Sequence, residues 1–120
     1  MYKITDVCMY ATVKISLYTK SDDKEYFTTW DIFEDDIADE LYEYSFEQMP
    51  SEHEVMELVK KLIDEHVESI KNKYDLYQMN ICIENENGKS CDDVNMDDLK
   101  WGILEDIDLT LDDYEVEQVN

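Results

Sequence analysis

Residues 51–74 read SEHEVMELVKKLIDEHVESIKNKY, and the fold can be worked out from this stretch. Ser51 and Glu54 match the capping box, in which two side chains satisfy free backbone N–H groups at the start of a helix. The following apolar residues recur at helical spacing: Val55, Leu58, Val59, Leu62, Ile63, Val67, Ile70 and Tyr74. The pattern predicts an amphipathic helix over about 51–73, packed on one face of a sheet.

The sheet is predicted to start upstream of this helix. Cys8–Tyr18 alternates between apolar and polar residues with period two, which is typical of a half-buried strand. Residues 19–24 are polar and predict a turn. Glu25–Phe33 is rich in aromatic and β-branched residues and is expected to pair back as a hairpin.

The segment Glu34–Phe46 fits two structures. The spacing of Ile37 and Leu41 favours a short helix, but the aromatic residues in 42–46 alternate as in a strand. We favour a helix or turn from about Asp35 to Glu43.

The last third of the chain predicts further strands. Leu76–Glu84 reads as a strand, and Asn87-Gly88 favours a tight turn with a short return strand through Cys91. The residues expected on one face of the first of these strands are Tyr77, Met79, Ile81 and Ile83.

Asn95–Leu104 could form a short helix, and Glu105–Leu111 alternates like a strand. The alternation changes phase after Asp112-Asp113, which implies a bulge, a turn or a fraying tail. Together the elements predict a single domain, 1–120, of the α+β class. Its sheet is expected to be largely antiparallel, with four or five strands and one long helix on one face.

Negative charge is concentrated in two blocks of this chain. Its 32 acidic residues and 10 lysines give a formal net charge of −22. Residues 25–54 contain eleven acids and no lysine, and residues 92–120 contain eleven acids and one lysine. The helix between the blocks is close to neutral, so the charge is not spread evenly over the surface.

The chain contains no arginine, the side chain best suited to bidentate phosphate and base contacts. With this net charge, direct binding to DNA, RNA or an anionic membrane is excluded as a function. The charge indicates a cationic partner instead, either a protein that itself binds nucleic acid or a metal ion.

The remaining signals indicate a cytoplasmic protein. The first residues lack the apolar core of a signal peptide, and no run is long enough to span a membrane. Cys8, Cys82 and Cys91 are odd in number, which favours reduced thiols in a cytoplasm.

The spacing of the carboxylates resembles that of DNA phosphates. Acids two apart on a strand lie about 6.6 Å apart, and acids four apart on a helix about 6 Å apart. Successive phosphates of one DNA strand are separated by about 6–7 Å. Such pairs also occur on any acidic solvated face, so the spacing alone does not distinguish phosphate mimicry from an ordinary solvated surface.

Aromatic residues typical of interface centres lie within the two blocks: Tyr42, Tyr44, Phe46, Trp101 and Tyr114. Each of these is also a candidate core residue.

Metal and catalytic motifs do not fit the sequence. Both candidate calcium-loop registers lack the required glycine or the final glutamate, and no zinc or cofactor motif is present. An irregular calcium site among Asp92, Asp93, Asp97 and Asp98 remains an alternative. His53 and His66 lie thirteen residues apart without a nucleophile partner, so we expect a protein that is not an enzyme.

In size, charge and lack of arginine, the chain resembles the small acidic inhibitors of phages and mobile elements. These include anti-restriction and anti-CRISPR proteins that act as DNA mimics. The resemblance implies a non-enzymatic inhibitor, without cofactors, that occupies the basic groove of a nuclease or other DNA-binding protein in a bacterial cytoplasm. The expected partner-binding residues are Asp35, Asp36, Asp39, Glu40, Glu43, Asp106, Asp108, Asp112, Asp113 and Glu115.

Three other functions fit the same charge. The chain could be an immunity protein that neutralises a basic toxin, a Ca²⁺-binding or other cation-binding protein, or an acidic subunit whose charge serves solubility alone.

The net charge predicts that salt stabilises the fold. Repulsion within a chain of charge −22 opposes compaction, and added NaCl screens it. We expect the melting temperature to rise between low and high NaCl concentration in a thermal denaturation series. A flat or falling melting temperature would contradict this.

Overall fold

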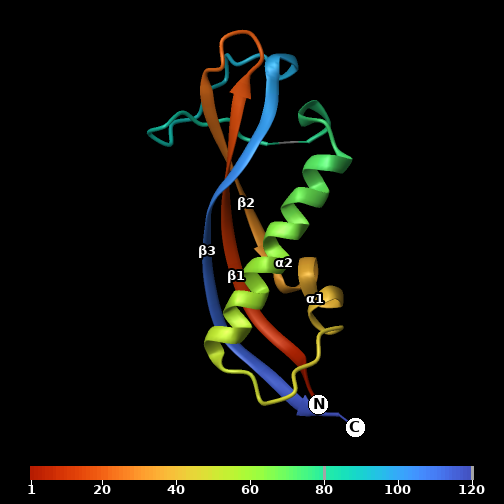
Figure 1. The fold of residues 1–120 in the computed structure, drawn as a ribbon. Helices are drawn as coiled ribbons and strands as arrows, with labels where there is room; N and C mark the ends of the chain where they lie inside the picture. Colours follow the sequence, from red (N-terminus) through yellow and green to blue (C-terminus); the bar gives the residue numbers. More distant parts are fainter. Residues whose placement is uncertain (80, 120) are drawn as a thin grey trace. The chain divides into compact units, whose positions relative to one another are not determined.

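The computed structural model describes residues 1–79 and 81–119, with the side chain of Tyr77 outside the described part. It has the mixed α+β architecture that the sequence predicts, with an antiparallel sheet of three described strands in the order β2-β1-β3 (Figure 1). The elements, in chain order, are β1 (Tyr2–Thr19), β2 (Glu25–Phe33), α1 (Glu34–Leu41), α2 (Glu52–Lys73), two short 3-10 helices (Leu76–Gln78 and Met96–Asp98) and β3 (Leu99–Gln118).

The chain forms two compact units, each assembled from segments distant in the sequence. The first unit comprises Met1–Ala11, Asp31–His66 and Asp108–Asn120, and the second comprises Thr12–Trp30 and Val67–Ile107. Each of β1, α2 and β3 contributes residues to both units.

In the first unit, helices cover one face of the sheet. On β1, Val7, Met9 and Ala11 are buried, whereas Cys8 and Tyr10 are exposed. The alternation confirms the predicted half-buried strand. In this unit, α1 and the first part of α2 lie on one side of the sheet (Figure 1). Their buried residues are Ile37, Leu41, Val55, Val59, Leu62 and Ile63.

The helices predicted over about 51–73 and from about Asp35 are confirmed. The backbone N–H of Glu54 donates to Ser51 Oγ at 3.2 Å, and the N–H of Ser51 donates to Glu54 Oε1 at 3.4 Å, so the capping box forms. The short helix α1 ends at Leu41 and is followed by a turn. Phe46 then makes an isolated bridge to Tyr2, so the strand-like alternation of residues 42–46 does not produce a strand. Among the described residues, no helix has the length and apolar content to cross a membrane.

The second unit shows that the prediction of four or five strands is wrong. Its core contains Leu17, Tyr26, Leu76, Ile83 and Leu99. The segment predicted as strand 76–84 instead begins with a 3-10 helix and reaches β2 through a single bridge. The side chain of Tyr77, which was predicted to lie on one face of that strand, is outside the described part of the structure.

The predicted return strand is reduced in the same way to one bridge, between Glu84 and Ser90. The physical reason is the composition of residues 84–90, which are polar or glycine throughout. A strand gains stability by packing side chains on its neighbours, and these residues offer little apolar surface to bury.

The predicted helix Asn95–Leu104 is also wrong beyond its first turn, because β3 already begins at Leu99. Ser16 Oγ accepts a hydrogen bond from the backbone N–H of Ile103 at 2.9 Å, which ties this segment to β1. Pairing with β1 therefore outweighs the local helical pattern. Further along β3, the phase change at Asp112-Asp113 leaves both residues exposed inside a continuous strand. A bulge is compatible with this phase change, whereas a turn or a fraying tail is not, because β3 continues to Gln118.

Gly102 is required by the close approach of β1 and β3. A Cβ at this position would lie 2.7 Å from the carbonyl oxygen of Ser16 and 2.7 Å from Tyr18 Cε2. We expect Gly102→Ala to lower the free energy of unfolding by about 1–3 kcal/mol, because the backbone oxygen cannot rotate away. Urea denaturation measures the change, with Thr110→Ala at an exposed position of the same strand as the control. Equal stabilities for the two variants would contradict the steric argument.

Candidate partner-binding surface

All ten acidic residues predicted to bind a partner are exposed in the structure. Those on α1 are Asp35, Asp36, Asp39 and Glu40, with Glu43 in the turn that follows; those on β3 are Asp106, Asp108, Asp112, Asp113 and Glu115. Asp106 belongs to the second unit, and the other nine belong to the first. Asp35 and Asp39 have the predicted helical spacing, but Glu43 lies beyond the end of α1 at Leu41.

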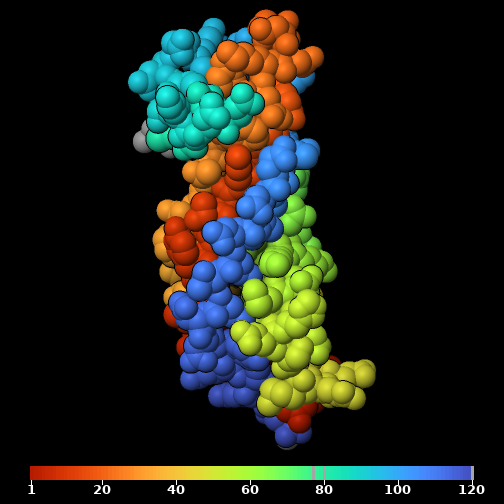
Figure 2. All heavy atoms as spheres, turned by 90° about the vertical axis from the view of Figure 1, so that its left-hand side faces the viewer, coloured from red at the N-terminus to blue at the C-terminus, as the bar shows by residue number. Residues whose placement is uncertain are grey.

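The acids of β3 point to the open face of the sheet. In the first unit, Leu109 and Leu111, and after the phase change Tyr114 and Val116, are half-buried and face the core. The exposed acids beside them therefore point the opposite way. In the first unit that opposite face is the one on which Cys8 and Tyr10 are exposed. Figure 2 shows side chains of β3 (dark blue) and β1 (red) together at the surface, with no helix over them in this view.

The pKa of the Cys8 thiol indicates that this face is strongly negative. Desolvation and then the negative charges of Asp112, Glu34, Asp113 and Asp6 raise the pKa of its thiol. Carboxylates from β1, the start of α1 and β3 therefore act on one central position. We call this set of Asp6, Glu34, Asp112 and Asp113 the acidic cluster.

Two members of the acidic cluster are absent from the predicted site. Glu34 lies inside the first acidic block and is half-buried at the start of α1. Asp6 lies in a stretch of low net charge, but the alternation of β1 offers a signal for it. Ile4 and Val7 are buried, and the two residues between them are both exposed. Such a break re-aims side chains, and here it turns Asp6 outward.

The same negative charges also act on Tyr42, which follows the end of α1. Desolvation, followed by the charges of Asp6 and Glu34, raises the pKa of its phenol. Asp35 makes a smaller contribution in the same direction. For Asp39, Glu40 and Glu43, the described residues show no interaction that joins them to the acidic cluster.

Two of the predicted acids also support the backbone. Asp36 Oδ2 accepts a hydrogen bond from the N–H of Phe33 at 2.9 Å, which anchors the start of α1. Asp113 Oδ1 accepts one from the N–H of Tyr114 at 2.8 Å, at the irregular part of β3. These two carboxylates therefore have a structural role in addition to their charge.

The ten acids are not neutralised by lysines within the described part of the chain. Its salt bridges join Lys71 to Glu68 at 3.0 Å and Lys100 to Asp23 at 3.2 Å. Neither pair includes any of the ten acids. The open face therefore keeps its negative charge in the folded protein.

The aromatic residues on the open face differ from those predicted. Tyr42, Tyr44, Phe46, Trp101 and Tyr114 are all half-buried. The exposed rings of the first unit belong instead to Phe33, with 52% of its surface accessible, and Tyr10, with 42%. Their centroids lie 5.5 Å apart. Both residues occupy polar-face positions of their strands, which is the sequence signal that could have identified them.

The structure offers no support for the calcium alternative. Among the described residues, no three His, Cys, Asp or Glu side chains are grouped closely enough to hold a metal ion. This includes Asp92, Asp93, Asp97 and Asp98. All three cysteines are free thiols in the structure.

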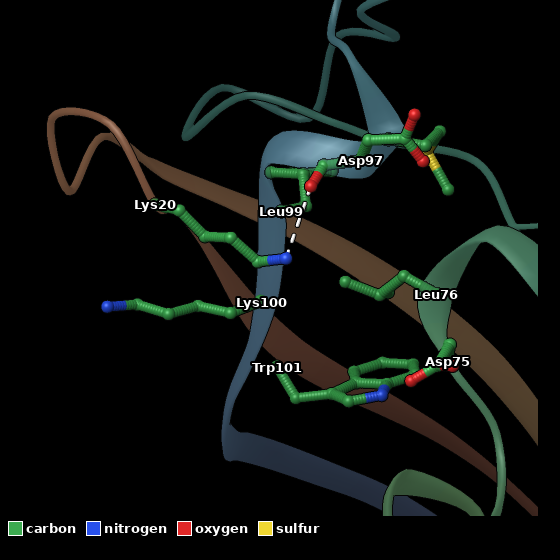
Figure 3. Close-up of a pocket in the computed structure, with 8 residues that line it drawn as sticks. Lys20, Asp75, Leu76, Asp97, Leu99, Lys100 and Trp101 are labelled. Carbon is green, nitrogen blue, oxygen red and sulfur yellow. Dashed lines mark hydrogen bonds between the residues drawn. The ribbon is translucent and has the colours of Figure 1, made fainter.

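The second unit contains a pocket of about 360 Å³, which Figure 3 shows in close-up. Leu76, Leu99 and Trp101 contribute to its lining. Its two lysines are already engaged. Lys20 Nζ donates to the carbonyl oxygen of Asp97 at 3.2 Å, and Lys100 is paired with Asp23. Both ammonium groups therefore already have an acceptor within this unit.

The negative field at Cys8 can be measured by alkylation. In a Cys82→Ser/Cys91→Ser background, we expect anionic iodoacetate to react more slowly relative to neutral iodoacetamide than it does with a free thiol. Asp112→Asn/Asp113→Asn should bring this ratio closer to the free-thiol value, because it removes two of the charges that act on Cys8. Glu57→Gln/Asp64→Asn on α2 is the matched control. A wild-type ratio equal to that of a free thiol would contradict the acidic cluster.

Comparisons with protein-family models, curated proteins and solved structures gave no match to this chain.

Proposed function

We propose that this protein is a non-enzymatic acidic inhibitor that binds the basic nucleic-acid-binding surface of another protein. Its carboxylates would occupy the positions of nucleic-acid phosphates, as in DNA mimics of the anti-CRISPR or anti-restriction type. The target would be a nuclease or another DNA-binding protein inside a bacterial host cell.

The observation that carries this proposal is an open sheet face whose acids lack internal counter-ions in the described part of the chain. On β3, acids two residues apart are about 6.6 Å from one another by strand geometry. The same spacing separates neighbouring phosphates to within about 1 Å. A rigid strand holds this spacing without further ordering, which reduces the entropy lost on binding.

The charge also determines how binding would depend on salt. Opposite charges on the two proteins accelerate their encounter, and this effect weakens as ionic strength rises. A specific complex should nevertheless survive moderate salt, because groups buried in an interface are screened less than exposed ones. Survival at moderate salt therefore separates specific binding from ion exchange.

A pull-down from bacterial lysate at about 50 mM and about 300 mM NaCl tests for such a target. We expect one basic nucleic-acid-binding protein to be retained at both concentrations and released by competing DNA. Capture of many basic proteins, all lost at the higher concentration, would show simple ion exchange and overturn the proposal.

Charge reversal on β3 tests the binding face itself. We expect Asp108→Lys/Asp112→Lys/Glu115→Lys to weaken binding to the captured target by at least about 100-fold at low salt, measured by calorimetry. The matched control is Glu57→Lys/Asp64→Lys/Glu65→Lys on the exposed side of α2. Both variants change the net charge from −22 to −16, because three carboxylates become three ammonium groups. Equal loss in both variants would show that only net charge matters.

A further inference from the structure

Phe33 is held in an exposed position by its surroundings. It is the last residue of β2, and its backbone N–H donates to Asp36 Oδ2 at 2.9 Å. Its ring packs against Tyr10 at a centroid distance of 5.5 Å and an interplanar angle of 50°. The phenol of Tyr10 donates in turn to Asp31 Oδ1 at 2.9 Å. These contacts place the ring on the open face, and 52% of the surface of Phe33 remains in water.

The charges near this ring are negative. Glu34 follows Phe33 directly, and Asp31 precedes it by two residues and points to the same face of β2. The effect of Glu34, Asp112 and Asp113 on Cys8 shows that this negative field extends across β1. A single exposed phenylalanine is ordinary on a protein surface. An ordered aromatic pair within a field of carboxylates is a more specific feature.

Four other aromatic rings of the described chain have one of its own lysines over them. Lys14 Nζ lies 4.3 Å from the ring centroid of Phe27, and other lysines lie 5.3–5.6 Å from the centroids of Tyr26, Tyr44 and Tyr74. Within the described residues, no lysine lies over Phe33. Its face is therefore left open for a cation from outside the chain, beside carboxylates that such a cation would also contact.

An arginine side chain matches this combination best. A guanidinium group stacks flat on an aromatic face and donates two hydrogen bonds to a carboxylate at its edge. An ammonium group can contact the ring but cannot form the planar pair with the carboxylate. The protein itself contains no arginine, so no internal side chain can occupy the site in this way.

We propose that the ring of Phe33, together with the carboxylates of Asp31 and Glu34, receives an arginine side chain of the basic partner. The inference rests on the proposed function, because it identifies one contact in the same acidic face. It adds a stacking contact on the ring, which strengthens the preference for arginine over lysine beyond what the carboxylates give alone.

Octa-arginine and octa-lysine peptides test this preference, because they carry the same charge. At about 150 mM NaCl, we expect wild-type protein to bind octa-arginine more tightly. Phe33→Leu keeps the side chain apolar but removes the ring, and should weaken octa-arginine binding about threefold to fivefold with little change for octa-lysine. Phe33→Tyr should retain the arginine preference. Tyr74→Leu, at a ring that is 40% exposed and covered by Lys73, is the matched control.

Thermal denaturation of each variant checks that the fold is retained. Unchanged octa-arginine affinity in Phe33→Leu, or no preference for arginine in the wild type, would overturn the arginine site. If the β3 charge reversal abolishes binding while Phe33→Leu does not, the acidic face stands and only the arginine site fails. If neither peptide and no basic protein binds the wild-type chain, both proposals fail.

Discussion

Repulsion among 32 carboxylates is the constraint on which the rest of this structure depends. The chain needs a continuous apolar core, but its charges must stay in water because a buried unpaired carboxylate is very costly. A sheet covered on one face meets both needs. In the first unit, β1 directs Val7, Met9 and Ala11 into the core and Cys8 and Tyr10 outward. The acids of the neighbouring edge strand β3 then gather on the same uncovered side.

The distribution of lysines determines what that uncovered side can do. Lys71 and Lys100 form salt bridges, and other lysines lie over aromatic rings. None of these contacts neutralises the acids of β3. A face that was acidic only for solubility would work equally well with its charges dispersed. Here the charges converge on Cys8 beside an ordered pair of exposed aromatic rings, an arrangement suited to a cationic protein surface.

Local patterns predicted the elements whose periodicity is regular. The period-two alternation of Cys8–Tyr18, the capping box at Ser51 and the helical spacing through Lys73 all correspond to observed elements. The strand predicted at 76–84 and the helix predicted at 95–104 are wrong, because pairing and packing with distant residues decide their structures. The exposure of the ten candidate acids was predictable. The convergence of Asp6 and Glu34 with the acids of β3 was not, because it depends on three segments meeting around Cys8.

The sequence by itself determined the class of fold, the long helix and the net negative charge, since these follow from periodicity and composition. Tertiary structure alone decided which carboxylates share a face. The physical reason is that side-chain orientation on β1 and β3 depends on breaks in alternation near Asp6 and Asp112, and a one-residue shift moves every following side chain to the other face. Phe33 and the acidic cluster lie on one surface only once the strands are paired.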